Sequence, residues 1–96
     1  MTIARRVVVR GRVQGVFFRE TTRRRAYRAG VAGWVRNNDD GTVEAWFEGD
    51  PDDVDVMLHF AEIGPSGAYV DGVDVQNVEP EGMRKGRPLQ TQRQHL

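Results

Sequence analysis

The spacing of hydrophobic residues changes along this 96-residue chain, and each change predicts a new element of secondary structure. A run of valines at 7–9 predicts a strand, and the glycine-bracketed segment 11–15 that follows predicts a loop. Residues 18–29 then place apolar and small side chains at helical spacing, and Gly30 is suited to end that helix. The first third of the chain is therefore predicted to form a strand, a loop and a helix.

The middle of the chain predicts a hairpin and a second helix. Two strand-like segments, 33–36 and 42–47, flank residues 37–41, whose Asn, Asp and Gly side chains tolerate left-handed backbone angles. The Asp-Pro pair at 50–51 is typical of a helix start, and an apolar stripe follows it as far as the Gly-Pro pair at 64–65.

Valines at 70, 73 and 75 predict one more strand. The resulting order βαββαβ is the α+β, ferredoxin-like split βαβ arrangement, in which two helices cover one face of an antiparallel sheet. After Val78 no periodic apolar pattern continues. We therefore predict one domain at residues 1–78 and an irregular C-terminal tail at 79–96.

Composition narrows the possible functions. Lys plus Arg and Asp plus Glu each number 14, so the formal net charge is zero and no global field favours nucleic acid or an anionic membrane. The absence of cysteine excludes a disulfide scaffold, a thiolate metal site and a cysteine nucleophile. No apolar segment is long enough for a signal peptide or a membrane span, so we expect a cytoplasmic protein.

The loop before the first predicted helix is a candidate phosphate site. Such a loop can turn backbone N–H groups inward, and the helix dipole favours an anion there. Arg19, in the first helical turn, could place its guanidinium on two phosphate oxygens. The candidate phosphate-binding residues are Gly11, Arg12, Val13, Gln14, Gly15, Val16, Phe17, Phe18 and Arg19. On spacing alone, an ordinary strand-to-helix connection is the commoner explanation, and neither nucleotide-binding glycine motif is present.

Three stretches carry a resemblance to a known family. The segment GRVQGVFFR at 11–19, followed by GVAGWVRN at 30–37 and DGTVE at 40–44, closely resembles the acylphosphatase family in order and spacing. The resemblance runs from about residue 7 to residue 78. It implies a hydrolase that cleaves the carboxyl–phosphate bond of small-molecule acyl phosphates, releasing a carboxylate and inorganic phosphate, with no metal and no cofactor. We expect it to act as a monomer.

The same resemblance implies residue roles. The loop at 14–16 would cradle the phosphate, Arg19 would grip it, and Asn37 would orient the attacking water. From local sequence alone Asn37 would be a turn residue. Asn38 stands where the family often has Thr or Ser.

Family members usually end with a short apolar edge strand, and residues 83–96 show no such pattern. We therefore expect that strand to be degenerate or missing. If it were present, we would expect it at the sheet edge, away from the loop and Asn37.

The implied chemistry suits the available side chains. The histidines, His59 and His95, lie far from the loop in sequence, so water is the expected nucleophile. The leaving carboxylate has a pKa of about 4 and departs without a general acid. Aspartates at 39–40 and 50–53 fit a hairpin turn and a helix start, so we expect no metal site.

Two other functions share parts of this pattern. Arginines at 23–25 and 28 could form a nucleic-acid patch on a fold that also hosts RNA-recognition modules. Trp46 and Phe47 are neighbours in a strand and point to opposite faces, which argues against an aromatic RNA platform. A phosphate-sensing domain, like the acylphosphatase-like module of hydrogenase maturation proteins, is the other alternative, but a free-standing enzyme is simpler and nucleic acid is not an expected partner.

Overall fold

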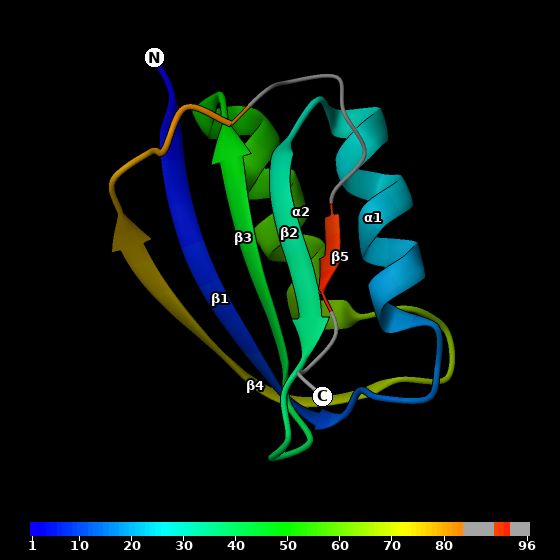
Figure 1. Cartoon of the computed structure of the whole chain (residues 1–96). Coiled ribbons are helices and arrows are strands. Elements are labelled where there is room, and N and C mark those ends of the chain that lie inside the picture. Colours follow the sequence, from blue (N-terminus) through cyan, green and yellow to red (C-terminus); the bar gives the residue numbers. More distant parts are fainter. Residues whose placement is uncertain (84–89, 93–96) are drawn as a thin grey trace.

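A five-stranded sheet carries two helices on one face (Figure 1). The computed structural model describes residues 1–83 and 90–92. Its elements are β1 (Ile3–Arg12), α1 (Phe18–Ala29), β2 (Ala32–Asn37), β3 (Val43–Gly49), α2 (Pro51–Ile63), β4 (Tyr69–Val78) and β5 (Gln90–Gln92). From β1 to β4 this order confirms the predicted ferredoxin-like βαββαβ arrangement.

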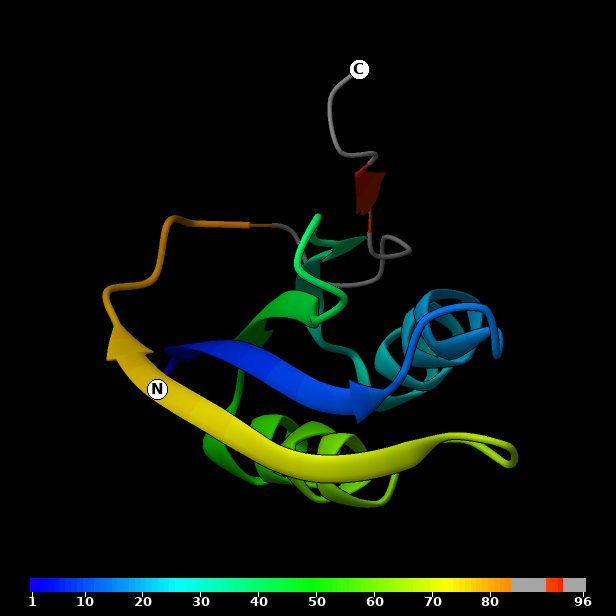
Figure 2. The ribbon, with the colours of Figure 1, turned by 90° about the horizontal axis from the view of Figure 1, so that it is seen from below.

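The strands lie in the order β4-β1-β3-β2-β5. Strand β1 pairs antiparallel with both β3 and β4, and β2 pairs antiparallel with β3. Figure 2 shows both helices on the same side of the twisted sheet, while residues 79–83, drawn in orange, pass over the other side. Because β1 and β2 both run antiparallel to β3, the loop after β1 and the end of β2 lie at the same end of the sheet.

The core lies between the sheet and the helices. Alternate residues of β3, Val43, Ala45 and Phe47, are buried toward the helices, as the strand period requires. Helices α1 and α2 meet through Phe18 and Phe60, whose ring centroids are 5.8 Å apart. This packing fixes the first turn of α1, which carries Arg19, against the rest of the fold.

The opposite face of β3 is also buried, although it points away from the helices. Glu48 is only 2% exposed. Its carboxylate accepts hydrogen bonds from the backbone N–H groups of Glu81 (2.9 Å), Gly82 (2.8 Å) and Met83 (2.9 Å). The Trp46 indole N–H donates a further bond of 3.0 Å. A charge-assisted contact of this kind holds the chain that follows β4 on the sheet.

The region after residue 78 differs from the sequence prediction of an irregular tail. Residues 90–92 form β5, which pairs parallel with residues 34–36 of β2. The edge strand that we expected to be degenerate or missing is therefore present but short. It is held by backbone pairing, which requires no apolar pattern in the sequence. The expectation that it would lie away from Asn37 is wrong, because β2 ends at Asn37. The boundary at residue 78 stays a prediction, and residues 84–89 and 93–96 lie outside the described part.

Acidification should weaken the contact at Glu48. Burial by itself raises the pKa of Glu48, but the N–H donors of 81–83 and of Trp46 outweigh burial and hold that pKa below its ordinary value of 4.5. Because the pKa of Glu48 is lower in the folded state than in the unfolded state, the contact stabilises the fold fully above pH 4.5. This stabilisation is lost as the pH falls through the lowered folded-state pKa. We expect Glu48→Gln to lower the free energy of unfolding at neutral pH by about 1–3 kcal/mol and to flatten its acid dependence.

Urea unfolding at neutral pH and at about pH 4 measures both effects. Glu79→Gln, at an exposed position beside the same segment, is the matched control and should change neither quantity. Equal unfolding curves for Glu48→Gln and the control would contradict the assigned role of Glu48.

Candidate active site

The connection between β1 and α1 has an unusual backbone. Gly15 has φ 76° and Phe17 has φ 59°, both in the left-handed region. Phe17 is the residue immediately before α1, so its conformation turns the chain into the helix. The first N–H groups of a helix have no partner within it and are available to an anion.

Gly11 has a structural role in the sheet, where it allows β1 to lie close to β4. Gly11 lies in β1 with φ 130°, at a register irregularity, and an added Cβ would clash with the Tyr69 carbonyl oxygen. Arg12 also lies in β1, paired with Tyr69. These two residues were predicted to bind phosphate, but the structure places them outside the pocket described next.

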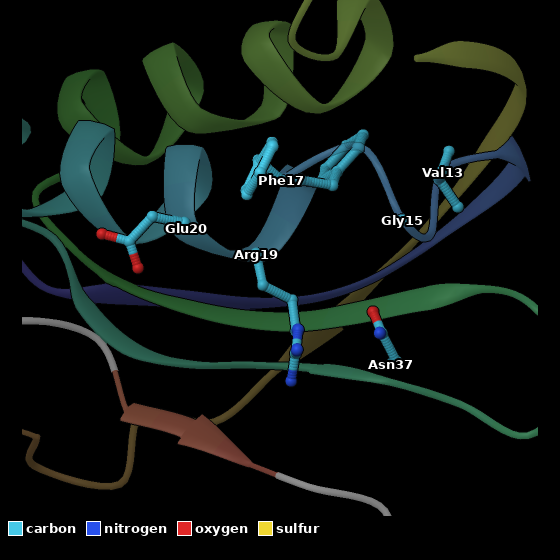
Figure 3. Close-up of a pocket in the computed structure, with 7 residues that line it drawn as sticks. Val13, Gly15, Phe17, Arg19, Glu20 and Asn37 are labelled. Carbon is cyan, nitrogen blue, oxygen red and sulfur yellow. The ribbon is translucent and has the colours of Figure 1, made fainter. Parts of the chain in front are cut away.

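A pocket of about 300 Å³ lies beside this loop. It is lined by Val13, Gly15, Phe17, Phe18, Arg19, Glu20 and Asn37. The side chains of Arg19, from α1, and Asn37, from the end of β2, extend toward the same space (Figure 3). The fold therefore brings together the two residues that the sequence predicted as catalytic, together with part of the predicted loop; Gln14 and Val16 do not line the pocket.

Neither Arg19 nor Asn37 has a side-chain hydrogen bond or ion pair to any residue in the described part of the chain, and both are partly exposed. By contrast, Glu20 on the pocket wall is engaged, since both of its carboxylate oxygens accept 2.9 Å bonds from Arg23. Arg19 is the only cationic residue among those that line the pocket. A free guanidinium beside a helix start is suited to bind an anion.

Gln14 links the loop to the hairpin formed by β2 and β3. Its Nε2 group donates to the carbonyl oxygens of Asn38 at 2.8 Å and Thr42 at 2.9 Å. The sequence predicted Gln14 as part of the phosphate cradle, but its side chain is used to position the hairpin against the loop. Local sequence contains no signal for this role, because the acceptors lie 24 and 28 residues further along the chain.

Asn38 takes up the polar contacts at the end of β2. Its Nδ2 group donates to Thr42 Oγ1 at 3.0 Å and to Glu44 Oε1 at 3.1 Å. The Thr42 hydroxyl and N–H in turn donate to Asp40 at 2.7 and 3.0 Å, which lowers the pKa of the Asp40 carboxyl. The amide at position 38, where the resemblance led us to expect Thr or Ser, therefore holds the turn through these contacts.

Glu44 holds the residues on both sides of Asn37. This carboxylate is 2% exposed and accepts hydrogen bonds from Arg6, Arg36 and Asn38. Burial raises the pKa of Glu44, but these donors outweigh burial and the pKa is lowered. Because Arg36 and Asn38 share this acceptor, the backbone of Asn37 is held while its side chain stays free. The sequence did not predict this role for Glu44.

Other candidate groups lie away from the pocket. His59 is exposed on α2, and its Nδ1 atom lies 3.1 Å from the Asp55 carbonyl oxygen, whereas His95 is outside the described residues. Within residues 1–83 and 90–92, no group of three or more His, Cys, Asp or Glu could hold a metal ion. Neither helix described has the length and apolar character needed to cross a membrane.

Three of the four arginines considered as a nucleic-acid patch have contacts within the protein. Arg23 and Arg24 pair with Glu20, and the Arg25 guanidinium lies 4.9 Å from the centre of the Phe60 ring. Trp46 stacks on Trp34 with centroids 6.4 Å apart, on the sheet face opposite to buried Phe47. The structure thus offers no exposed pair of aromatic rings on the described part of β3.

Comparison with known proteins gives consistent matches. The acylphosphatase family model matches residues 5–86. An acylphosphatase of Rubrobacter xylanophilus is 53% identical over 81 residues, covering 84% of this chain and 74% of that protein. An acylphosphatase of Haloarcula marismortui is 54% identical over 77 residues, covering 80% and 85%. The solved structure of an acylphosphatase from Coxiella burnetii superposes with a TM-score of 0.87 at 31% identity, covering 95% of this chain and 93% of that one.

Proposed function

Since this chain belongs to the acylphosphatase family and hydrolyses acyl phosphates, we propose that Arg19 binds the phosphate and Asn37 orients the attacking water. The observation that carries this proposal is the pocket itself. Its single cation and the Asn37 amide reach the same space, and both lack partners in the described part of the protein. The neighbouring side chains of Arg36 and Asn38, by contrast, form hydrogen bonds with Glu44.

Phosphate binding would combine the Arg19 guanidinium with the N–H groups at the start of α1. A guanidinium can donate two parallel hydrogen bonds to phosphate oxygens. The positive end of the helix dipole adds to the attraction. The left-handed angles at Gly15 and Phe17 turn the loop around this position, which favours a compact tetrahedral anion.

Hydrolysis would then proceed by in-line attack of water on phosphorus. A bond forms between the water oxygen and phosphorus, the bond from phosphorus to the acyl oxygen breaks, and its electron pair leaves on the carboxylate. The water proton passes to phosphate or solvent, and the products are a carboxylate and inorganic phosphate. Because the leaving carboxylate has a pKa of about 4, no general acid is needed.

Asn37 would act by position, since an amide is not a base at neutral pH. Its oxygen can accept a hydrogen bond from water while its nitrogen donates another, which fixes the water for attack. The contacts of Glu44 with Arg36 and Asn38 support this proposal, because they hold the backbone on both sides of Asn37.

The test is hydrolysis of benzoyl phosphate by the wild-type chain in the presence of a metal chelator, followed as release of inorganic phosphate. We expect turnover under these conditions and competitive inhibition by inorganic phosphate. Folded protein that binds phosphate but gives no turnover would replace the proposed mechanism with phosphate sensing. Absence of both effects, with binding of single-stranded RNA, would favour the nucleic-acid alternative. Independence of metal and cofactor, the monomeric state and a cytoplasmic location stay predictions.

A further inference from the structure

The side chain of Phe17 is exposed at the wall of the pocket. It is 80% accessible, whereas the next residue, Phe18, is 3% accessible and packs on Phe60. Phe17 is also the only residue other than glycine with a positive φ among the described residues. An aromatic side chain is disfavoured in that conformation, and an exposed ring gains nothing from burial to compensate.

Two adjacent phenylalanines therefore have different surroundings. Phe18 belongs to the core and fixes α1. Phe17 contributes nothing to the core, yet it lines the pocket that holds Arg19 and Asn37. Large exposed apolar groups beside a binding site commonly mark a contact with a ligand.

The position of Phe17 suits the acyl part of the substrate. In an acyl phosphate only one oxygen separates the phosphorus from the acyl carbon, so the acyl group must lie directly beside the phosphate site. Phe17 is two residues from Arg19 and borders the same space. Among the pocket residues, Val13 and Phe18 are also apolar, and the one cation is committed to the phosphate in the mechanism above.

We propose that the Phe17 ring is the platform on which the acyl group packs, and that it makes the enzyme prefer acyl phosphates with an apolar, above all aromatic, acyl group. This inference rests on the proposed function, because it takes Arg19 as the phosphate ligand. An aromatic ring on the substrate would gain from an offset or edge-to-face contact with Phe17. A small acyl group such as acetyl would gain little.

The experiment compares kcat/KM for benzoyl phosphate and acetyl phosphate in the wild type, Phe17→Asn and Phe17→Leu. Asn tolerates left-handed backbone angles and keeps the loop N–H group, but it lacks the ring. Leu keeps an apolar surface without an aromatic face. The readout is the ratio between the two substrates, since any general effect on the loop changes both rates together.

We expect Phe17→Asn to lower the benzoyl-to-acetyl ratio about tenfold, the low end of discrimination by apolar contacts, and Phe17→Leu to lower it less. Tyr27→Asn removes an exposed ring on α1 that does not line the pocket, and it should leave both rates unchanged. An unchanged ratio in Phe17→Asn, with both substrates still hydrolysed, would overturn the acyl platform and leave the proposed function standing. Folded wild type that hydrolyses neither substrate would overturn both.

Discussion

Arg19→Ala should lower kcat/KM for benzoyl phosphate by several hundredfold. The substitution removes the only cation on the pocket wall, and loss of one charged contact to a developing phosphate charge typically costs about 3–4 kcal/mol. Because phosphate is charged in the ground state and in the transition state, both KM and kcat should worsen. Steady-state kinetics, together with the inhibition constant for inorganic phosphate, measure the two contributions.

Arg28→Ala is the matched control for this prediction. Arg28 lies on the same helix, is exposed and does not line the pocket, so its removal should leave both constants near wild type. Arg19→Lys keeps the charge without the planar fork and should recover only part of the loss. A folded Arg19→Ala protein with wild-type kinetics would show that the phosphate is bound elsewhere.

Asn37→Ala should lower kcat by roughly a hundredfold to a thousandfold with little change in KM. The expected pattern differs from that of Arg19, because the amide positions water and does not hold the phosphate. The contacts of Glu44 with Arg36 and Asn38 do not involve the Asn37 side chain, so the variant should keep its fold. Circular dichroism and urea unfolding check this point, and kinetics with benzoyl phosphate give kcat and KM separately.

Asn77→Ala is the control on an exposed strand position away from the pocket, and we expect it to have no kinetic effect. A rise in KM for Asn37→Ala that equals its loss of kcat/KM would contradict water positioning, because it would indicate a contact made equally in the ground state. If kcat were unchanged, another group would have to orient the water.

The relative position of Arg19 and Asn37 depends on a contact outside the pocket. Arg19 and Asn37 belong to different elements, and the Gln14 side chain joins the loop before Arg19 to the turn after Asn37. A small shift between these elements would separate the phosphate from the water. Small errors in the position of catalytic groups commonly lower the rate by a large factor. The hydrogen bonds of Gln14 therefore support the site although Gln14 does not line the pocket.

Much of the fold could be predicted from local patterns in the chain. The helical spacing at 18–29 matches α1, the turn residues at 38–41 connect β2 to β3, and the Asp-Pro pair at 50–51 stands at the start of α2. These patterns succeed because periodicity reports which side of an element is apolar, and turn residues report backbone angles that other residues avoid. The order of elements then leaves few topologies, and the ferredoxin-like arrangement is one of them.

Tertiary structure decided what depends on partners far apart in the chain. The polar strand β5 is stabilised by parallel backbone pairing with β2. Because every residue except proline carries the same backbone groups, this pairing cannot be predicted from the pattern of side chains. The buried carboxylates Glu44 and Glu48 look like surface residues in a strand, because Arg6 and the N–H groups of residues 81–83, which help to satisfy them, come from remote segments. The sequence by itself therefore determined the elements and the residue types of the site. Only folding decided that Gln14 would join loop and hairpin, and that Arg19 and Asn37 would face one pocket, since contact between distant residues is a property of packing.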